Sequence, residues 1–326
     1  IKAAAYARGM QRQNVLASAK HFPGHGDTGQ DSHFSMPVIN KTKKQLTETE
    51  LFPFQYLISD SVASVLTGHL YVPSLDNGKN RSGTVSKRIV TDLLKNEMGF
   101  QGLAITDALV MQGLTKYYGS GNAELEAFKA GNDLLLQPKS VSTAFNRIQS
   151  ALTSGEITLA ELDERVRNIL RAKYWAGLNR RQRVDLNNLQ NDLNNSEAQQ
   201  IKAELFNNAV TIVKNETELL PFIDLDVNRF ASISVSPARD SKFKESLDQY
   251  ADFKHFTIPF KPSKNADWSS VVAQAANYDV VVVGVHDTNS RRSRNYGMTP
   301  ATVKLINELQ KSTKVGVCMF GNPYGL

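Results

Sequence analysis

The segment from Lys20 to His33 concentrates side chains that can do acid, base or ligand chemistry. It reads Lys-His-Phe-Pro-Gly-His-Gly-Asp-Thr-Gly-Gln-Asp-Ser-His, with three of the chain's six histidines and two aspartates. Glycine or proline at four of its positions lets the backbone turn sharply, so the polar groups can face one point. An apolar stretch at 15–19 predicts a strand just before it, which makes the segment a loop at a strand end.

Three kinds of chemistry fit this loop, besides the alternative that it is only a solvated turn. Two histidines and a carboxylate suit zinc or iron, although no HExxH-type spacing occurs. The Pro-Gly-His-Gly stretch resembles a nest of backbone N–H groups for phosphate, but it lacks the Walker pattern. The third is an acid/base pair. The candidate metal ligands are His21, His25, Asp27, Asp31 and His33.

Asp31 and His33 are spaced as an acid/base dyad. Residues two apart in an extended chain point the same way, so the carboxylate can orient the imidazole and stabilise its charge. A neighbouring anion raises the pKa of a histidine, which leaves His33 able to give and take a proton near neutrality. Ser32 lies between them and is expected to be a spacer, because no separate base for it is evident.

Asp107 ends a second informative stretch, Gly-Phe-Gln-Gly-Leu-Ala-Ile-Thr-Asp-Ala-Leu at 99–109. The apolar residues at 103–106 predict a strand with this carboxylate at its carboxyl end. An isolated aspartate at such a place is commonly a helix N-cap. In a barrel of parallel strands it would instead face the mouth where catalytic groups gather.

Together, the His-rich loop and the strand ending Ile-Thr-Asp-Ala-Leu resemble glycoside hydrolase family 3. The similarity is to its β-N-acetylglucosaminidase branch, which includes NagZ-like peptidoglycan-processing enzymes. Residues 67–69, 72–76 and 128–136 support the resemblance, and the helix expected at 162–178 resembles the end of the family's barrel domain. The resemblance is close over about 3–178 and looser beyond, where an αβα domain often follows.

The resemblance implies a retaining exo-β-N-acetylglucosaminidase acting on muropeptides or chitin-type oligosaccharides. Asp107 matches the family's nucleophile, and His33 matches its unusual acid/base, with Asp31 as dyad partner. A β-glucosidase or β-xylosidase of the same family is one alternative, but these take their acid from a glutamate in the second domain. A phosphorylase is another, since histidine repels phosphate less than a carboxylate does. A non-catalytic glycan-binding relative would need to have lost one of these residues.

The resemblance also implies residues that contact the sugar. Lys20 and His21 match residues that hydrogen-bond its hydroxyls, and His69 either lines the pocket or is structural. His25 and Asp27 are expected to shape the loop. No metal ion or cofactor is expected.

The elements that must position these residues alternate between strand-like and helical patterns, which predicts an α/β fold. We expect the C-terminal part of a (β/α)8 TIM-type barrel at 1–177, an Asn-, Arg- and Gln-rich linker at 178–195, and a partial αβα sandwich at 196–326. Only about four barrel-type strands precede the linker where a barrel needs eight. We therefore expect a fragment without the barrel front and without the back of the second domain. The strands are expected at 15–19, 63–67, 103–106, 133–136, 209–213, 231–235, 279–285 and 315–320.

Composition limits the remaining function classes. The 326 residues carry a formal charge of +6 without a Lys/Arg block, so nucleic acid is not an expected partner. A lone cysteine, Cys318, rules out an internal disulfide framework and a Cys-rich zinc module. No apolar run is long enough to span a membrane. Two-domain members of the branch are often exported, so we expect a periplasmic or extracellular location, with the cytoplasm left open and the oligomeric state not predicted.

Overall fold

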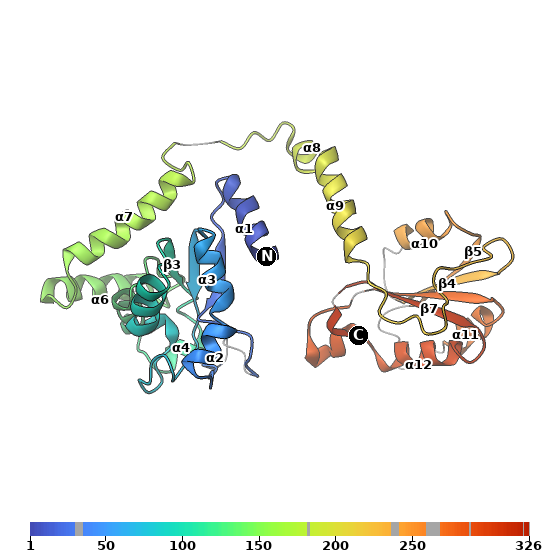
Figure 1. The fold of residues 1–326 in the computed structure, drawn as a ribbon, viewed down its shortest axis with the longest axis horizontal. Helices are drawn as coiled ribbons and strands as arrows, with labels where there is room; N and C mark the ends of the chain where they lie inside the picture. Colours follow the sequence, from blue (N-terminus) through green and yellow to red (C-terminus); the bar gives the residue numbers. More distant parts are fainter. Residues whose placement is uncertain are drawn as a thin grey trace. The chain divides into compact units, whose positions relative to one another are not determined.

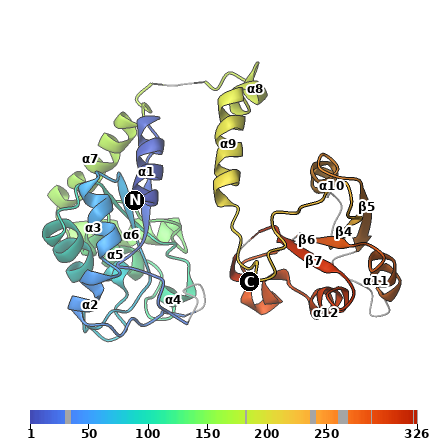
Figure 2. The same cartoon turned by 45° about the vertical axis from the view of Figure 1, so that its right-hand side comes forward.

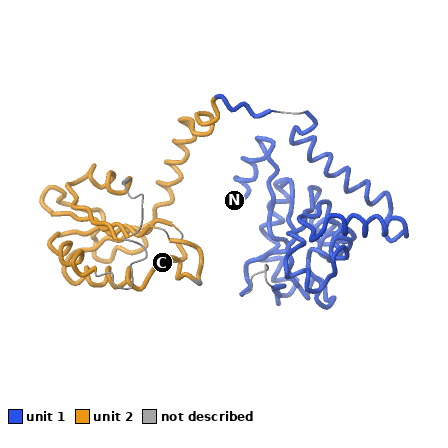
Figure 3. The backbone as a smooth tube through the Cα atoms, turned by 180° about the vertical axis from the view of Figure 1, so that it is seen from behind, with its two compact units in different colours: residues 1–187 blue, residues 188–326 orange. Residues whose placement is uncertain are grey.

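The chain forms two compact units in a computed structural model, residues 1–187 and residues 188–326 (Figures 1 and 3). The structure describes residues 1–29, 35–180, 183–235, 241–258, 268–286, 288–321 and 323–325. The division between the units lies inside the segment 178–195 that the sequence predicts to be a linker, and this segment includes a short helix, α8 (Leu189–Leu193).

A parallel sheet in the order β1-β2-β3 organises the first unit. Its strands are β1 (Ser18–Phe22), β2 (Ser64–Thr67) and β3 (Leu103–Thr106). Thr67 pairs with Thr106, and the β1–β2 register shifts between Lys20 and Phe22. Because parallel strands end at one edge of a sheet, the loops after all three strands leave from the same edge. These are the loops in which the sequence places most of its candidate residues.

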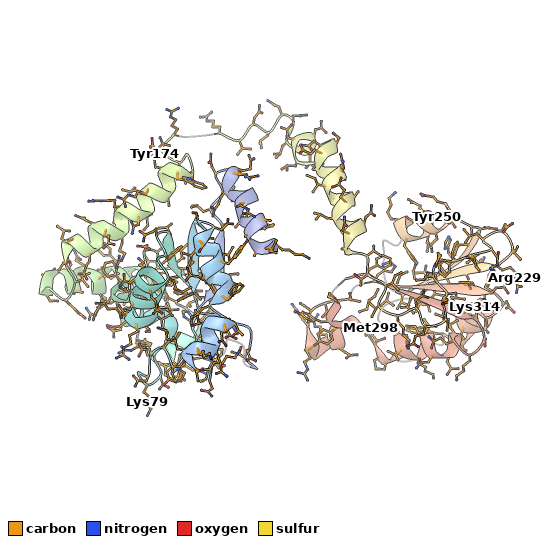
Figure 4. All side chains as sticks on the ribbon, in the orientation of Figure 1. Lys79, Tyr174, Arg229, Tyr250, Met298 and Lys314 are labelled. Atoms are coloured by element: carbon orange, nitrogen blue, oxygen red, sulfur yellow. The ribbon has the colours of Figure 1, made fainter. Side chains whose placement is uncertain are left out.

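Helices cover this sheet, and the strands and helices share a buried apolar core that includes Phe22, Val65, Phe54 and Leu94. Thr158 followed by Glu161 predicts a capping box at the start of a helix, and the structure confirms it: the Thr158 side chain and Glu161 cap each other's backbone N–H groups. The helices are α1 (Lys2–Arg12), α2 (Lys43–Glu48), α3 (Phe52–Ser59), the 3₁₀ turn η1 (Gly83–Val85), the π-helix η2 (Arg88–Glu97), α4 (Gln112–Thr115), α5 (Asn122–Ala130), α6 (Val141–Ser154) and α7 (Leu159–Trp175). Along α7 several apolar side chains stay exposed, among them Tyr174 (Figure 4).

The prediction of a strand at 133–136 is wrong for the described structure, which has only a single bridge there, between Ile105 and Leu134. Side chains replace part of the ladder. Asp133 Oδ2 accepts a hydrogen bond from the Ala104 N–H at 2.8 Å, and Thr106 Oγ1 accepts one from the Leu136 N–H at 2.8 Å. The segment lies against β3, held by these side chains together with backbone bonds such as Asp133 N–H to the Ala104 carbonyl at 2.7 Å and Thr106 N–H to the Leu134 carbonyl at 3.0 Å.

Asp133 is the centre of a buried ionic cluster. Its side chain has no exposed surface, Lys95 Nζ lies 3.2 Å from Oδ2, and Asn168 of α7 donates to Oδ1 at 3.0 Å. Burial lowers the pKa of Lys95, against the opposing charge of Asp133. Removing the carboxylate therefore leaves a largely buried ammonium without its counter-charge.

We expect Asp133→Ala to lower the free energy of unfolding of the first unit by about 3–5 kcal/mol, the usual cost of removing one partner of a buried ion pair. Glu126→Ala is the matched control, because it breaks an exposed pair with Lys129 and should cost less than about 1 kcal/mol. Urea unfolding in a Trp268→Phe background, where Trp175 is the remaining tryptophan, reports on this unit. Equal losses in the two variants would contradict the expectation.

The second unit is built on a parallel sheet in the order β5-β4-β6-β7. Its strands are β4 (Phe230–Val235), β5 (Phe253–Ile258), β6 (Val280–Val285) and β7 (Lys314–Met319). Helices α11 (Ser269–Ala275) and α12 (Pro300–Leu309) pack on one face, and α10 (Ser241–Leu247) packs on the other (Figure 2). The unit also contains α9 (Ser196–Ala209) and the 3₁₀ segments η3 (Arg292–Gly297) and η4 (Pro323–Gly325).

Strands β4 and β6 are the two central strands of this sheet. All six residues of β4 and of β6 are buried, as expected of central parallel strands covered on both faces. At their N-terminal edge Arg229 pairs with Asp279, N to O 3.0 Å (Figure 4). The Arg229 guanidinium holds the pKa of the Asp279 carboxyl down at about 2.

Among the described residues no helix is long and apolar enough to cross a membrane.

Candidate active site

Asp107 lies directly after β3, at the edge of the sheet where the strands end. Its N–H donates to the Thr67 carbonyl of β2 at 2.9 Å, which extends the ladder by one residue into the site. Its carboxylate oxygen Oδ1 accepts a hydrogen bond from the Ala108 N–H at 2.8 Å. The side chain is 17 % exposed, so the carboxylate is held in place while it remains accessible to a reactant.

His21 approaches this carboxylate from β1, two strands away. Its Nε2 lies 3.8 Å from Asp107 Oδ2, longer than a hydrogen bond but close enough for the two groups to bind one ligand. Gly68 allows the approach, because a Cβ added at this glycine would lie only 3.0 Å from the His21 Cβ. The structure thus brings together two of the predicted residues. Lys20 lies beside His21 on β1 and is exposed.

The beginning of the Gly-rich loop is fastened to Lys41 and Glu50, which lie just before and just after α2. Gly24 has φ +134° and packs so tightly against Glu50 that no side chain would fit there. Lys41 Nζ lies 2.9 Å from Asp27 Oδ2 and also pairs with Glu50. These contacts agree with the expectation that Asp27 shapes the loop.

Charge and hydrogen bonding stabilise this anchor in its ionised form. The hydrogen bonds to Glu50 and Asp27 raise the pKa of Lys41. Burial opposes ionisation of Glu50, but hydrogen bonds from Lys41 and Thr49 outweigh it and keep the pKa of Glu50 below its ordinary value. The first part of the loop, through Asp27, therefore has a fixed attachment near neutral pH.

Asp31 and His33 lie outside the described residues, so their predicted acid/base roles stay predictions. The same holds for a metal site that would use them. Among the residues that the structure does describe, no three His, Cys, Asp or Glu side chains gather closely enough to hold a metal ion.

His69 follows β2, but it does not line an open pocket. It has no exposed surface, and its two ring nitrogens lie within hydrogen-bond distance of Thr84 Oγ1 and of the Ala108 carbonyl. Of the two roles that the sequence left open for this residue, these contacts favour the structural one over contact with a sugar. Sequence reasoning missed Thr84, since a threonine before a helix carries no signal of such a contact.

Comparison of the sequence with known proteins shows which family it matches. The sequence model described as "Glycosyl hydrolase family 3 N terminal domain" matches residues 2–172. A "Beta-hexosaminidase A" of Pseudoalteromonas piscicida is 30% identical over 239 residues, which are 68% of this chain and 39% of that protein. A "Beta-N-acetylglucosaminidase/beta-glucosidase" of Cellulomonas fimi is 26% identical over 286 residues, 83% of this chain and 50% of that protein. The chain therefore spans half or less of the length of these relatives.

A solved structure supports the fold over nearly the whole chain. The glycoside hydrolase family 3 beta-N-acetylglucosaminidase from Paenibacillus sp. str. FPU-7 superposes with a TM-score of 0.77 at 24% identity, covering 99% of this chain and 62% of that one. With the family match, this confirms the predicted α/β class with a TIM-barrel-like first part.

Proposed function

The chain belongs to glycosyl hydrolase family 3, and from this premise we propose that it acts as a retaining exo-β-N-acetylglucosaminidase with Asp107 as its nucleophile. The observation that carries the proposal is the carboxylate after β3, fixed by the Ala108 N–H, partly exposed and 3.8 Å from His21. A retaining glycosidase needs such a group to attack the anomeric carbon. The substrates that we propose are muropeptides or chitin-type oligosaccharides.

In the first step, an Asp107 oxygen bonds to the anomeric carbon while the bond to the leaving oxygen breaks. We assign the proton that the leaving oxygen takes to His33, with Asp31 stabilising the imidazolium. In the second step, His33 removes a proton from water as the water oxygen attacks the anomeric carbon and releases Asp107. We also assign to His21 and Lys20 hydrogen bonds to sugar hydroxyls beside the nucleophile.

The N-acetyl preference is supported by the names of two relatives. The Pseudoalteromonas protein is named a beta-hexosaminidase, and the Cellulomonas protein is named for both N-acetylglucosaminide and glucoside. An acetamido carbonyl can itself attack the anomeric centre, so an enzyme that uses Asp107 must hold this group aside. Because the name of the Cellulomonas protein includes beta-glucosidase, a family 3 β-glucosidase is the second candidate.

Two nitrophenyl glycosides distinguish these candidates. We expect the full-length protein to hydrolyse the β-N-acetylglucosaminide with a kcat/KM at least about 10-fold above that of the β-glucoside, the discrimination that loss of one well-placed contact gives. The comparison is of kcat/KM, because that ratio measures transition-state binding of the two sugars. A preference for the glucoside would contradict the proposal and direct the search for the acid to the second unit.

A further inference from the structure

A buried hydrogen-bond network lies behind the proposed nucleophile. His69 Nε2 lies 3.0 Å from the Ala108 carbonyl oxygen, and His69 Nδ1 lies 2.9 Å from Thr84 Oγ1. Neither His69 nor Thr84 has any exposed surface. Water therefore does not compete for these contacts, and each group depends on its protein partner.

Ala108 is held on both of its polar sides. Its N–H donates to Asp107 Oδ1 at 2.8 Å, and its carbonyl accepts from His69 Nε2 at 3.0 Å as well as from the Met111 N–H at 3.0 Å. The orientation of Ala108 sets the direction of the N–H that fixes the carboxylate. A ring that holds the carbonyl therefore also holds the carboxylate, although it does not touch a reacting atom.

Hydrogen-bond geometry makes Nε2 of His69 a donor. The Ala108 carbonyl can only accept, so Nε2 carries the hydrogen. Thr84 Oγ1 donates to the Thr67 carbonyl at 3.0 Å and lies 2.9 Å from His69 Nδ1. Burial lowers the pKa of His69, against the opposing effects of the Ala108 carbonyl and the charge of Asp107. The contact from Nε2 to the Ala108 carbonyl does not depend on the charge of the ring, because Nε2 keeps its hydrogen in both the neutral and the charged form.

Asn132 fixes the far side of this network. Its Nδ2 donates to the Thr84 carbonyl at 2.9 Å, and its Oδ1 accepts from Thr67 Oγ1 at 2.9 Å. Thr84 is thereby bound through its backbone as well as its hydroxyl. The chain of contacts runs without a gap from Asn132, just after α5, through η1 and His69 to the residue after the nucleophile.

We propose that His69 is a positioning residue for Asp107: it orients Ala108, whose N–H fixes the nucleophilic carboxylate. The inference rests on the proposed role of Asp107. It predicts that loss of the Nε2 contact lowers kcat/KM at each competent site, in addition to any decrease in the amount of folded protein.

Two substitutions separate the contacts of the ring. His69→Asn places an amide near the Nδ1 position, so it can keep Thr84 as partner while it loses Ala108. His69→Gln places an amide nitrogen near the Nε2 position, so it can keep Ala108. We expect kcat/KM per competent site to fall by about 100-fold in His69→Asn, the scale of a small misplacement of a reacting group, and by less than about 10-fold in His69→Gln.

Competent sites are counted with a 5-fluoro glycosyl fluoride, which traps the covalent intermediate. The pH profile of kcat/KM is the readout that a merely structural role would not move. In His69→Asn the carboxylate loses its fixed N–H donor, so its ionised form is less stabilised. The acid limb of the profile should then shift to higher pH than in the parent, while His69→Gln should keep the parent limb.

A control of equal chemistry is His255→Asn in the second unit, which removes a ring held by Ser232 and Asp248 and should leave the acid limb unchanged. A parent that is not labelled at Asp107 would overturn the proposed function, and this inference with it. A parent labelled there, with an unshifted limb and undiminished kcat/KM per site in His69→Asn, would overturn the inference alone. If His69→Asn yields no folded protein, a His69→Gln variant that loses about 100-fold per site overturns the inference as well.

Discussion

Asp107→Ala should lower turnover by at least about 10⁴-fold, the scale on which removal of a covalent nucleophile acts. The loss follows from the geometry after β3, where the Asp107 carboxylate lies beside His21 and remains partly exposed. It is measured as kcat/KM on the nitrophenyl N-acetylglucosaminide. Mass spectrometry of the parent treated with the 5-fluoro trap should place the label on the peptide that contains Asp107.

Azide supplies a second readout for the same variant. A small anion can enter the space left by the lost carboxylate and attack the anomeric carbon, which gives an α-glycosyl azide on a substrate with a good leaving group. Asp92→Ala, which removes an exposed carboxylate on η2, is the control and should keep parental kcat/KM. A label on another residue, or parental turnover in Asp107→Ala, would remove the nucleophile assignment.

Strands that form a continuous backbone ladder with a neighbouring strand can be predicted from the sequence. The strand predicted at 103–106 is confirmed as β3, and the one at 63–67 is confirmed as β2 from residue 64. Apolar residues there are bounded by Gly102 and by polar strand ends, and both strands are largely buried. In the second unit, the run of valines at 280–283 likewise predicts β6.

Other elements depend on contacts that no local pattern records. The strand expected at 15–19 lies instead at 18–22, because pairing with β2 carries the polar Lys20 and His21 into the sheet. The strand expected at 209–213 is absent from the described structure, where α9 extends to Ala209 and the next residues are exposed without a neighbouring strand. A strand without a partner to pair with has no ladder, whatever its propensity.

Two further differences between the expected and the observed elements have an explanation in the local sequence. The helical pattern at 47–59 predicts a single helix, but the structure has two helices there, α2 and α3. Pro53 at the start of α3 is the reason, since a proline has no N–H for a continuing helix. The expected strands do not include β5, although Phe253, Phe256 and Ile258, which are aromatic or β-branched, stand among polar residues as is typical of an edge strand.

The candidate site is readable in part for the same reasons. Asp107 follows β3 and His21 lies near the carboxyl end of β1, so parallel pairing brings them to one edge. The burial of His69 follows from the residues at 84, 108 and 132, which lie far from it in the sequence and have no motif in common. Spacing identifies residues with chemistry, but it does not tell a residue that touches the substrate from one that holds its neighbour.

His33→Ala should lose activity according to the leaving group. On an alkyl or methylumbelliferyl N-acetylglucosaminide, kcat/KM should fall by about 10²–10⁴-fold, because the departing oxygen needs a proton from a general acid. On a dinitrophenyl glycoside, whose leaving oxygen departs as an anion, the fall should be less than about 10-fold. Equal losses on both substrates would exclude His33 from the acid role.

Asp31→Asn tests the dyad behind this acid, with the sign of its effect fixed by charge. The Asp31 anion favours the protonated imidazole of His33, and the neutral amide removes that stabilisation. The acid would then lose its proton at lower pH, so the alkaline limb of kcat/KM should move to lower pH while the acid limb stays in place. Ser32→Ala, between the two, should leave both limbs unchanged. An alkaline limb that stays in place in Asp31→Asn would mean that the carboxylate does not act on His33, and that the histidine obtains its proton affinity from other groups.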